Sequence, residues 1–224
     1  MKIMAIVAMA SMIGMTAPAE RTVTVYVHND LNTHGVLFQA QQRAAKMFAE
    51  VGVRLDWRTG SPSGARAEPE PVIVVSLAEQ APASYSPEAL ASAKVYEGVH
   101  ITVFWDRIAR LSRFAQPTVV LAHVLVHEIT HILQGIDRHS ETGVMKAHWT
   151  PEDYRAMESK PLPFTPVDVQ LIQLGLAPSP DPVRWPSEFR SEEYKLSYNS
   201  GEPEQHESGT LPRSRKVVPR RSRA

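Results

Sequence analysis

Two histidines and a glutamate near the middle of the chain have the types and spacing of a metal-dependent hydrolytic site. His127 and His131 stand four positions apart, and Glu128 directly follows the first of them. On a helix this spacing places both imidazoles on one face, where they can reach the same metal ion. The carboxylate between them can act as a base on a water molecule at that metal. We therefore predict a helix that carries two zinc ligands and a general base.

The residues after this motif offer a third nitrogen ligand. Gly135 is placed to end the helix in a left-handed conformation. The chain can then turn back and present His139 to the metal. Three protein ligands leave one coordination position open for water, which distinguishes a catalytic zinc site from a structural one.

The surroundings of the motif argue against a coincidence. Residues 119–133 are almost entirely apolar apart from the motif and a few polar neighbours, which is typical of a helix buried nearly all round. Buried histidines and acids need a partner, and a metal ion supplies one. His123 lies one turn before His127 on the same face, but only the later pair brackets a glutamate. We interpret His123 as structural or supporting, not as a ligand.

The N-terminal residues differ in composition from the rest of the chain. Residues 1–19 have a basic start, a short apolar stretch and the triplet Ala17-Pro18-Ala19. This pattern is typical of a secretory signal peptide, and the apolar stretch is short for a membrane span. We expect an exported protein, periplasmic or extracellular, with no stable membrane insertion after cleavage. An uncleaved membrane anchor is the alternative, which Pro18 in the cleavage motif keeps open.

The C-terminal residues predict a tail outside the catalytic domain. Residues 177–224 are rich in Pro, Ser, Glu and Arg and end in a basic run, so we expect disorder there. A solvated tail is the simplest interpretation, and contact with an anionic surface is the alternative. Residues 20–176 are then one zinc peptidase domain with its own core.

Composition excludes several classes of function. The chain has no cysteine, which excludes disulfides, thiolate zinc ligands and a cysteine nucleophile. Its formal net charge of +0 gives no reason to expect a nucleic-acid partner. We expect a monomer.

Hydrophobic periodicity predicts the elements that position the motif. The predicted strands are 22–27, 53–57, 71–77 and 99–105. The predicted helices are 36–50, 106–112, one from Pro117 through the motif, 150–159 and 165–174. This order predicts an α/β or α+β sandwich in which the active-site helix packs beneath a mostly parallel sheet.

The motif and the residues after it resemble the metzincin clan of zinc peptidases. The pattern of that clan is H-E-x-x-H-x-x-G-x-x-H, followed by a methionine turn beneath the metal. The corresponding residues here are His127, Glu128, His131, Gly135 and His139, with Gly143-Val144-Met145 in place of the turn. The spacing is longer by one residue on each side of the glycine. This longer form is similar to little-characterised bacterial exported proteins regarded as peptidases, over roughly residues 20–175.

The resemblance implies both a fold and an activity. The fold would be metzincin-like, a twisted mixed sheet over the active-site helix with a small helical C-terminal subdomain. The activity would be zinc-dependent hydrolysis of peptide or protein substrates by a metalloendopeptidase-like enzyme, with Glu128 as general base. Met145 would form an apolar floor. An extended substrate would pair with the segment 99–105 as the edge of the sheet.

Alternatives remain open for the third ligand and for the function. A thermolysin-like, gluzincin-type site would take a glutamate instead of His139, and the candidates are Glu141, Glu152 and Glu158. The order of residues in the metzincin pattern favours His139 as the third ligand. A zinc-binding interaction protein of the same fold, without turnover, is the alternative to an enzyme, and the presence of the glutamate in the motif favours the enzyme.

Other polar residues are candidates for supporting roles. His148 is a candidate fourth ligand or transition-state donor. The candidates for an oxyanion-stabilising donor are Tyr96, Arg138, His148 and Tyr154, and the sequence does not select among them.

Overall fold

The structure is a computed structural model that describes residues 21–62, 71–93 and 99–177. These residues belong to the first of two units into which the chain divides, Met1–Ser187, and the second, Glu188–Ala224, lies outside the described residues. The predicted signal peptide, Tyr96 and nearly all of the predicted tail also lie outside them.

A mixed sheet forms one layer of the fold. Its strands in the described residues are β1 (Arg21–His28), β2 (Val53–Thr59), β3 (Val72–Ala78), β4 (Ala91–Ala93) and β5 (His100–Phe104). Their order across the sheet is β2-β1-β3-β5-β4. Every neighbouring pair is parallel except β4 and β5, which are antiparallel. The prediction of a mostly parallel sheet is thus confirmed.

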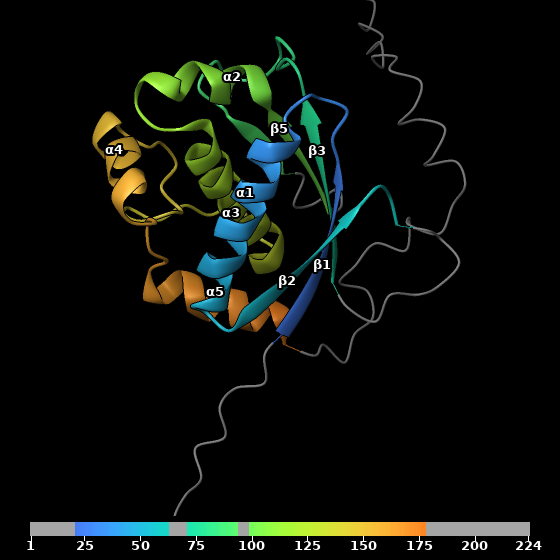
Figure 1. The fold of residues 1–224 in the computed structure, drawn as a ribbon. Coiled ribbons are helices and arrows are strands. Elements are labelled where there is room, and N and C mark those ends of the chain that lie inside the picture. The colour runs from blue at the N-terminus through green and yellow to red at the C-terminus, as the bar shows by residue number, and fades with distance from the viewer. Residues whose placement is uncertain (1–20, 63–70, 94–98, 178–224) are drawn as a thin grey trace, which may run out of the picture. The chain divides into compact units, whose positions relative to one another are not determined.

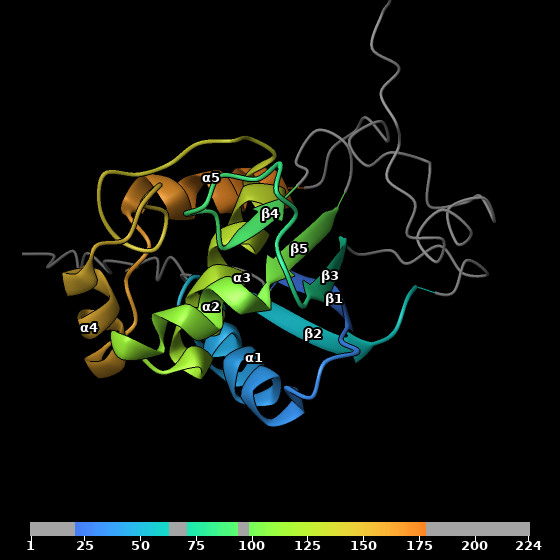
Figure 2. The same cartoon turned by 90° about the horizontal axis from the view of Figure 1, so that it is seen from above.

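Helices form the second layer. They are α1 (His34–Ala49), α2 (Trp105–Arg110), α3 (Pro117–Gln134), α4 (Pro151–Ser159) and α5 (Pro166–Leu176), with a 3₁₀ turn over Leu111–Arg113. In both Figure 1 and Figure 2, α1 and α3 lie side by side on one face of the sheet. The mixed α/β class is therefore as predicted.

The hydrophobic core lies between the sheet and this helical layer. Alternate residues of β1, Val23, Val25 and Val27, are buried together with Ile73 and Val75 of β3, as expected for one face of a pleated sheet. In α3 every residue except Pro117 and Glu128 is buried. Helix α3, which carries the two histidines and the glutamate of the motif, is thus a central core element, and its packing fixes its position.

One prediction about the sheet is wrong. The segment 99–105 is not an edge, because β5 pairs with β3 on one side and with β4 on the other. The strand at this end of the sheet is β4, Ala91–Ala93. Its three small residues, Ala-Ser-Ala, are too few for hydrophobic periodicity to predict a strand.

Candidate metal centre

Helix α3 is fixed at both ends. Before it, the backbone N–H of Gln116 donates a hydrogen bond to the Glu158 carboxylate, and Pro117 occupies the first turn. After it, Gly135 adopts a φ of 66°, and its N–H donates to the carbonyl of His131 at 2.9 Å. The predicted left-handed end of the helix is confirmed. His127 and His131 therefore lie one turn apart on a well-anchored helix.

The rings of these two histidines direct equivalent atoms at one point. Nδ1–H of His127 donates to the Val144 carbonyl at 2.9 Å, and Nδ1–H of His131 donates to the Ile136 carbonyl at 3.2 Å. Because carbonyl oxygens only accept, each Nδ1 carries the hydrogen and each Nε2 presents a lone pair. The two Nε2 atoms lie 3.0 Å apart.

Two lone pairs at this separation repel each other unless they share a cation. A hydrogen bond between the Nε2 atoms would require one ring to be protonated at both nitrogens. Burial opposes that charge: it lowers the pKa of His127 to about 3, with a further contribution from His131. Burial also lowers the pKa of His131. A tetrahedral zinc ion with bonds of about 2.0–2.1 Å would separate two nitrogens by about 3.3 Å, so the pair fits a metal.

His139 reaches the same point from the loop after α3. Its ring centroid is 5.3 Å from that of His127 and 4.9 Å from that of His131. One ligand nitrogen from each ring lies within 4.8 Å of the other two. Among the described residues, this is the group of three side chains close enough to hold one metal ion. The structure thus brings together the three predicted ligands.

The alternative glutamates lie elsewhere. Glu158 binds the backbone N–H before α3, and Glu152 accepts a hydrogen bond from Arg155 at 2.9 Å. Glu141 is exposed and is not part of the histidine group. This arrangement favours His139 over a glutamate as the third ligand.

Glu128 lines a cavity of about 850 Å³ together with His127 and His139. Burial, and secondarily the charge of Asp137, raises the pKa of Glu128 to about 8, while a hydrogen bond from the backbone of Ala93 in β4 lowers it. A divalent cation at the histidines would favour the ionised carboxylate. Because Ala93 belongs to a strand that periodicity did not predict, this contact could not be predicted either.

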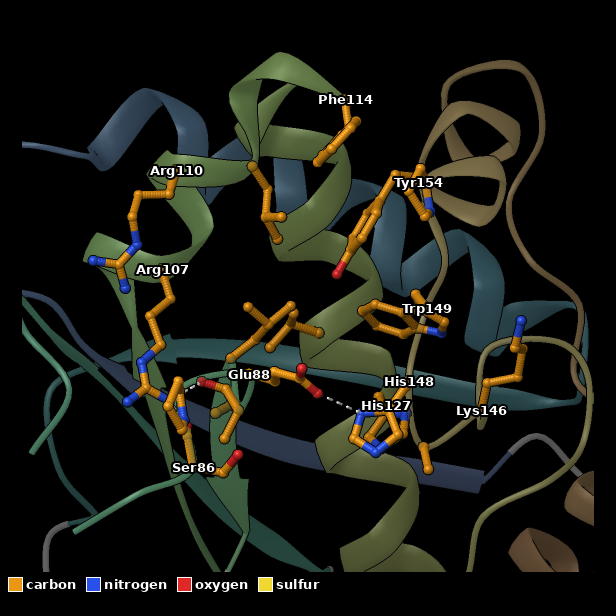
Figure 3. A pocket seen from close by; sticks show the side chains of 18 of the residues that line it. Ser86, Glu88, Arg107, Arg110, Phe114, His127, Lys146, His148, Trp149 and Tyr154 are labelled. Carbon is orange, nitrogen blue, oxygen red and sulfur yellow. Dashed lines mark hydrogen bonds and ion pairs between the residues drawn. The ribbon is translucent and has the colours of Figure 1, made fainter. Parts of the chain in front are cut away.

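Aromatic and cationic side chains contribute to the rest of the cavity lining, together with aliphatic residues (Figure 3). Trp149 packs edge-on against His127 with ring centroids 5.6 Å apart, and Phe114 stacks on Tyr154 at 6.1 Å. On the opposite side, Arg107 donates to the carbonyls of Ser86 and Ala89, which anchors the segment before β4. Trp149 and Tyr154 therefore lie on one side of the cavity, and Arg107 and Arg110 lie on the other (Figure 3).

The structure separates the candidates for an oxyanion donor. Tyr154 lines the cavity, and Figure 3 shows its hydroxyl turned towards the interior. His148 also lines it, but its side chain is 76% exposed and lies 3.5 Å from Glu88. Arg138 instead donates to Asp168 and Ser140. Of the described candidates, Tyr154 and His148 thus face the space where a substrate would bind.

His123 has a structural role, in agreement with the interpretation from sequence. Its Nδ1 donates to the Val119 carbonyl at 2.8 Å, and its Nε2 accepts from the Leu162 N–H at 3.1 Å. Both ring nitrogens are therefore occupied away from the three-histidine cluster.

The turn Gly143-Val144-Met145 supports the cluster through its backbone. The Val144 N–H donates to the Pro163 carbonyl at 3.0 Å, and its own carbonyl holds His127. Met145 is fully buried. The sequence indicated a turn here, but a backbone carbonyl carries no residue identity, so its partner could not be predicted.

Comparison with known proteins adds little to this geometry. No protein-family model matches the chain, and no curated protein sequence matches it. Among solved structures, the fold is similar to an archaemetzincin from Methanopyrus kandleri, with a TM-score of 0.45 and 12% sequence identity. The match covers 72% of this chain and 98% of the other. A likeness at this level carries no conclusion about activity, which has to come from the site itself.

Proposed function

We propose that this protein is a zinc-dependent hydrolase that cleaves peptide bonds. The observation that carries the proposal is the convergence of three imidazoles, two of them with their Nε2 atoms 3.0 Å apart, at a cavity that the Glu128 carboxylate also lines. Zinc bound by His127, His131 and His139 would supply Lewis acidity, lowering the pKa of water to about 7 and polarising the substrate carbonyl.

In the proposed reaction, Glu128 moves the proton. It accepts a proton from the attacking water and returns it to the leaving amine. It directly follows His127 and lines the same cavity as His127 and His139, and the Ala93 N–H orients it. The burial that raises its pKa also allows it to hold the proton between the two transfers.

The cavity and the sheet edge favour an extended peptide as the substrate. A cavity of about 850 Å³ accommodates several side chains. An extended chain can pair its backbone with a strand at the end of a sheet, and here that strand is β4. β4 therefore replaces the segment 99–105 as the proposed pairing strand.

Replacing Glu128 tests the proposal. Glu128→Gln preserves the size of the side chain and removes the base, so we expect zinc content to stay at the wild-type level. Turnover should fall by a factor of about 100 or more. Cleavage of a mixed peptide library is measured together with metal content. Glu152→Gln is the matched control, because Glu152 pairs with Arg155 on the surface and does not line the cavity.

Two outcomes would contradict the proposal. Equal activity of the wild type and Glu128→Gln would remove Glu128 from the mechanism. A wild-type protein that holds zinc but cleaves no peptide of the library would favour the zinc-binding interaction protein.

A further inference from the structure

The loop that carries His139 has no regular structure of its own. Between Gly135 and Ser140 the chain forms neither helix nor strand, and His139 is exposed. An exposed histidine on an irregular segment samples many positions unless its neighbours are held. The place of the third ligand therefore depends on the contacts of the residues beside it.

Both neighbours of His139 bind one buried carboxylate. Arg138 Nη1 donates to Oδ1 of Asp168 at 3.0 Å, and Ser140 Oγ donates to the same oxygen at 2.7 Å. Arg138 Nη1 also donates to Ser140 Oγ at 3.3 Å. The flanks of the histidine thus meet at a single atom, which fixes the backbone between them.

Asp168 is itself held by the start of α5. Its Oδ2 accepts from the N–H of Thr165 at 2.9 Å and from the Thr165 hydroxyl at 2.7 Å. Its own N–H returns a hydrogen bond to that hydroxyl at 3.2 Å, which completes a capping box. Its carbonyl accepts from the side chain of Gln134, the last residue of α3, at 3.4 Å. Asp168 is therefore connected to α3, the helix that carries His127 and His131.

The carboxylate is charged and completely buried. Asp168 has 0% exposure, and burial by itself would raise its pKa. Hydrogen bonds from Ser140, Thr165 and Arg138 outweigh that effect and hold the pKa below its ordinary value. A charged group without solvent requires these donors. The buried carboxylate therefore holds Arg138 and Ser140 in place, because losing either donor would leave its charge less well compensated.

We infer that Asp168 is a positioning residue of the metal centre: it holds Arg138 and Ser140, and through them keeps His139 within reach of His127 and His131. The inference rests on the proposed zinc site. A ligand that is already in place loses less conformational entropy when the metal binds, so the affinity is higher. Outer groups that orient ligands typically change metal affinity by about 10–100-fold.

The test compares zinc affinity in full-length variants by competition with a chelator. Asp168→Asn keeps the shape of the side chain but places an NH₂ group where an acceptor stood, so one set of donors loses its partner. We expect its zinc affinity to fall by about 10–100-fold. The absorption spectrum of the cobalt-loaded protein should also lose tetrahedral intensity, which a purely structural role would not alter.

Asp153→Asn is the matched control. Asp153 occupies the same capping-box position in α4, and its other contact is Lys146, not the loop of His139. We expect this variant to lose helix-cap stability and to keep wild-type zinc affinity and the wild-type cobalt spectrum.

Ser140→Ala provides a second test that leaves the cap of α5 intact. It removes one hydrogen-bond donor to Asp168. If Asp168→Asn does not fold, this variant still tests whether Asp168 positions His139. We expect it to weaken zinc binding by roughly tenfold. Wild-type affinity in Ser140→Ala, or in folded Asp168→Asn, overturns the inference about Asp168. A wild type that binds no zinc overturns the proposed function, and this inference with it, so the two failures are distinguishable.

Discussion

His123, His127 and His131 follow one another on α3 at intervals of one turn, yet the partners of their rings differ. His123 has both nitrogens bonded to backbone groups. The other two bond only Nδ1 to backbone and turn Nε2 towards each other. The partner of Nε2 therefore distinguishes a structural histidine from a candidate ligand. The spacing of the three histidines in the sequence does not show this difference.

The third ligand gives the first prediction at the scale of residues. His139→Ala should weaken zinc binding far more than Glu141→Ala, Glu152→Ala or Glu158→Ala, because only His139 lies with the other histidines. Zinc affinity is measured by chelator competition in all four variants. A larger loss from any glutamate variant would mean a thermolysin-like site.

His123 gives a prediction about pH. Burial lowers its pKa from 6.5, so below that pH the unfolded chain binds a proton that the folded protein excludes. Its contribution to stability is complete above about pH 6.5 and is lost as the pH falls through the lowered value. For zinc-free protein, we expect the free energy of unfolding to decrease from about pH 7.5 to about pH 5.5, by up to about 1.4 kcal/mol per pH unit for each buried histidine.

Urea unfolding of wild type and His123→Phe at both pH values checks this. The variant has no imidazole to titrate at this position, so its decrease should be smaller. An identical decrease in the two proteins would show that His123 is not protonated differently in the folded and unfolded states.

At the scale of elements, sequence patterns predicted those helices and helix ends that depend only on neighbouring residues in the chain. Helix α3, its start at Pro117 and its end at Gly135 follow from apolar residues and end signals. The roles of Ala93 and Asp168 could not be predicted, because each contacts a segment far along the chain. The sequence predicted a helix over 165–174, which includes Asp168, and gave this residue no other role. The same aspartate also serves the loop of His139, which no local pattern indicates.

The close approach of α5 to α3 gives a prediction at this scale. A Cβ atom added to Gly175 would lie 1.7 Å from the backbone oxygen of Leu133, so Gly175→Ala must separate the two helices. We expect a loss of stability of about 1–3 kcal/mol or more, as for other overpacked sites. Urea unfolding measures it.

Gly35→Ala is the control. Gly35 lies in the first turn of α1, where an added Cβ meets no atom within 4 Å. Alanine there should be neutral or stabilising by up to about 1 kcal/mol. Equal effects of the two substitutions would contradict the close packing of α3 against α5.

At the scale of the whole molecule, the described residues supply a complete set of candidate zinc ligands without cysteine. No helix among them is both long and apolar enough to cross a membrane. Export through a signal peptide over residues 1–19 stays a prediction, as do the domain boundaries at residues 20 and 176. A mature chain that begins at Glu20 in the extracytoplasmic fraction, identified by mass spectrometry, is the expected result.

The metal content of purified protein shows whether the whole chain binds one zinc ion at the three histidines. After removal of all metal, reconstitution with zinc and removal of the excess, elemental analysis should find about one zinc per chain in the wild type. The double variant His127→Ala/His131→Ala should retain almost none. Less than about half an equivalent in the wild type, or equal zinc in the two proteins, would show that the three histidines do not form a zinc site.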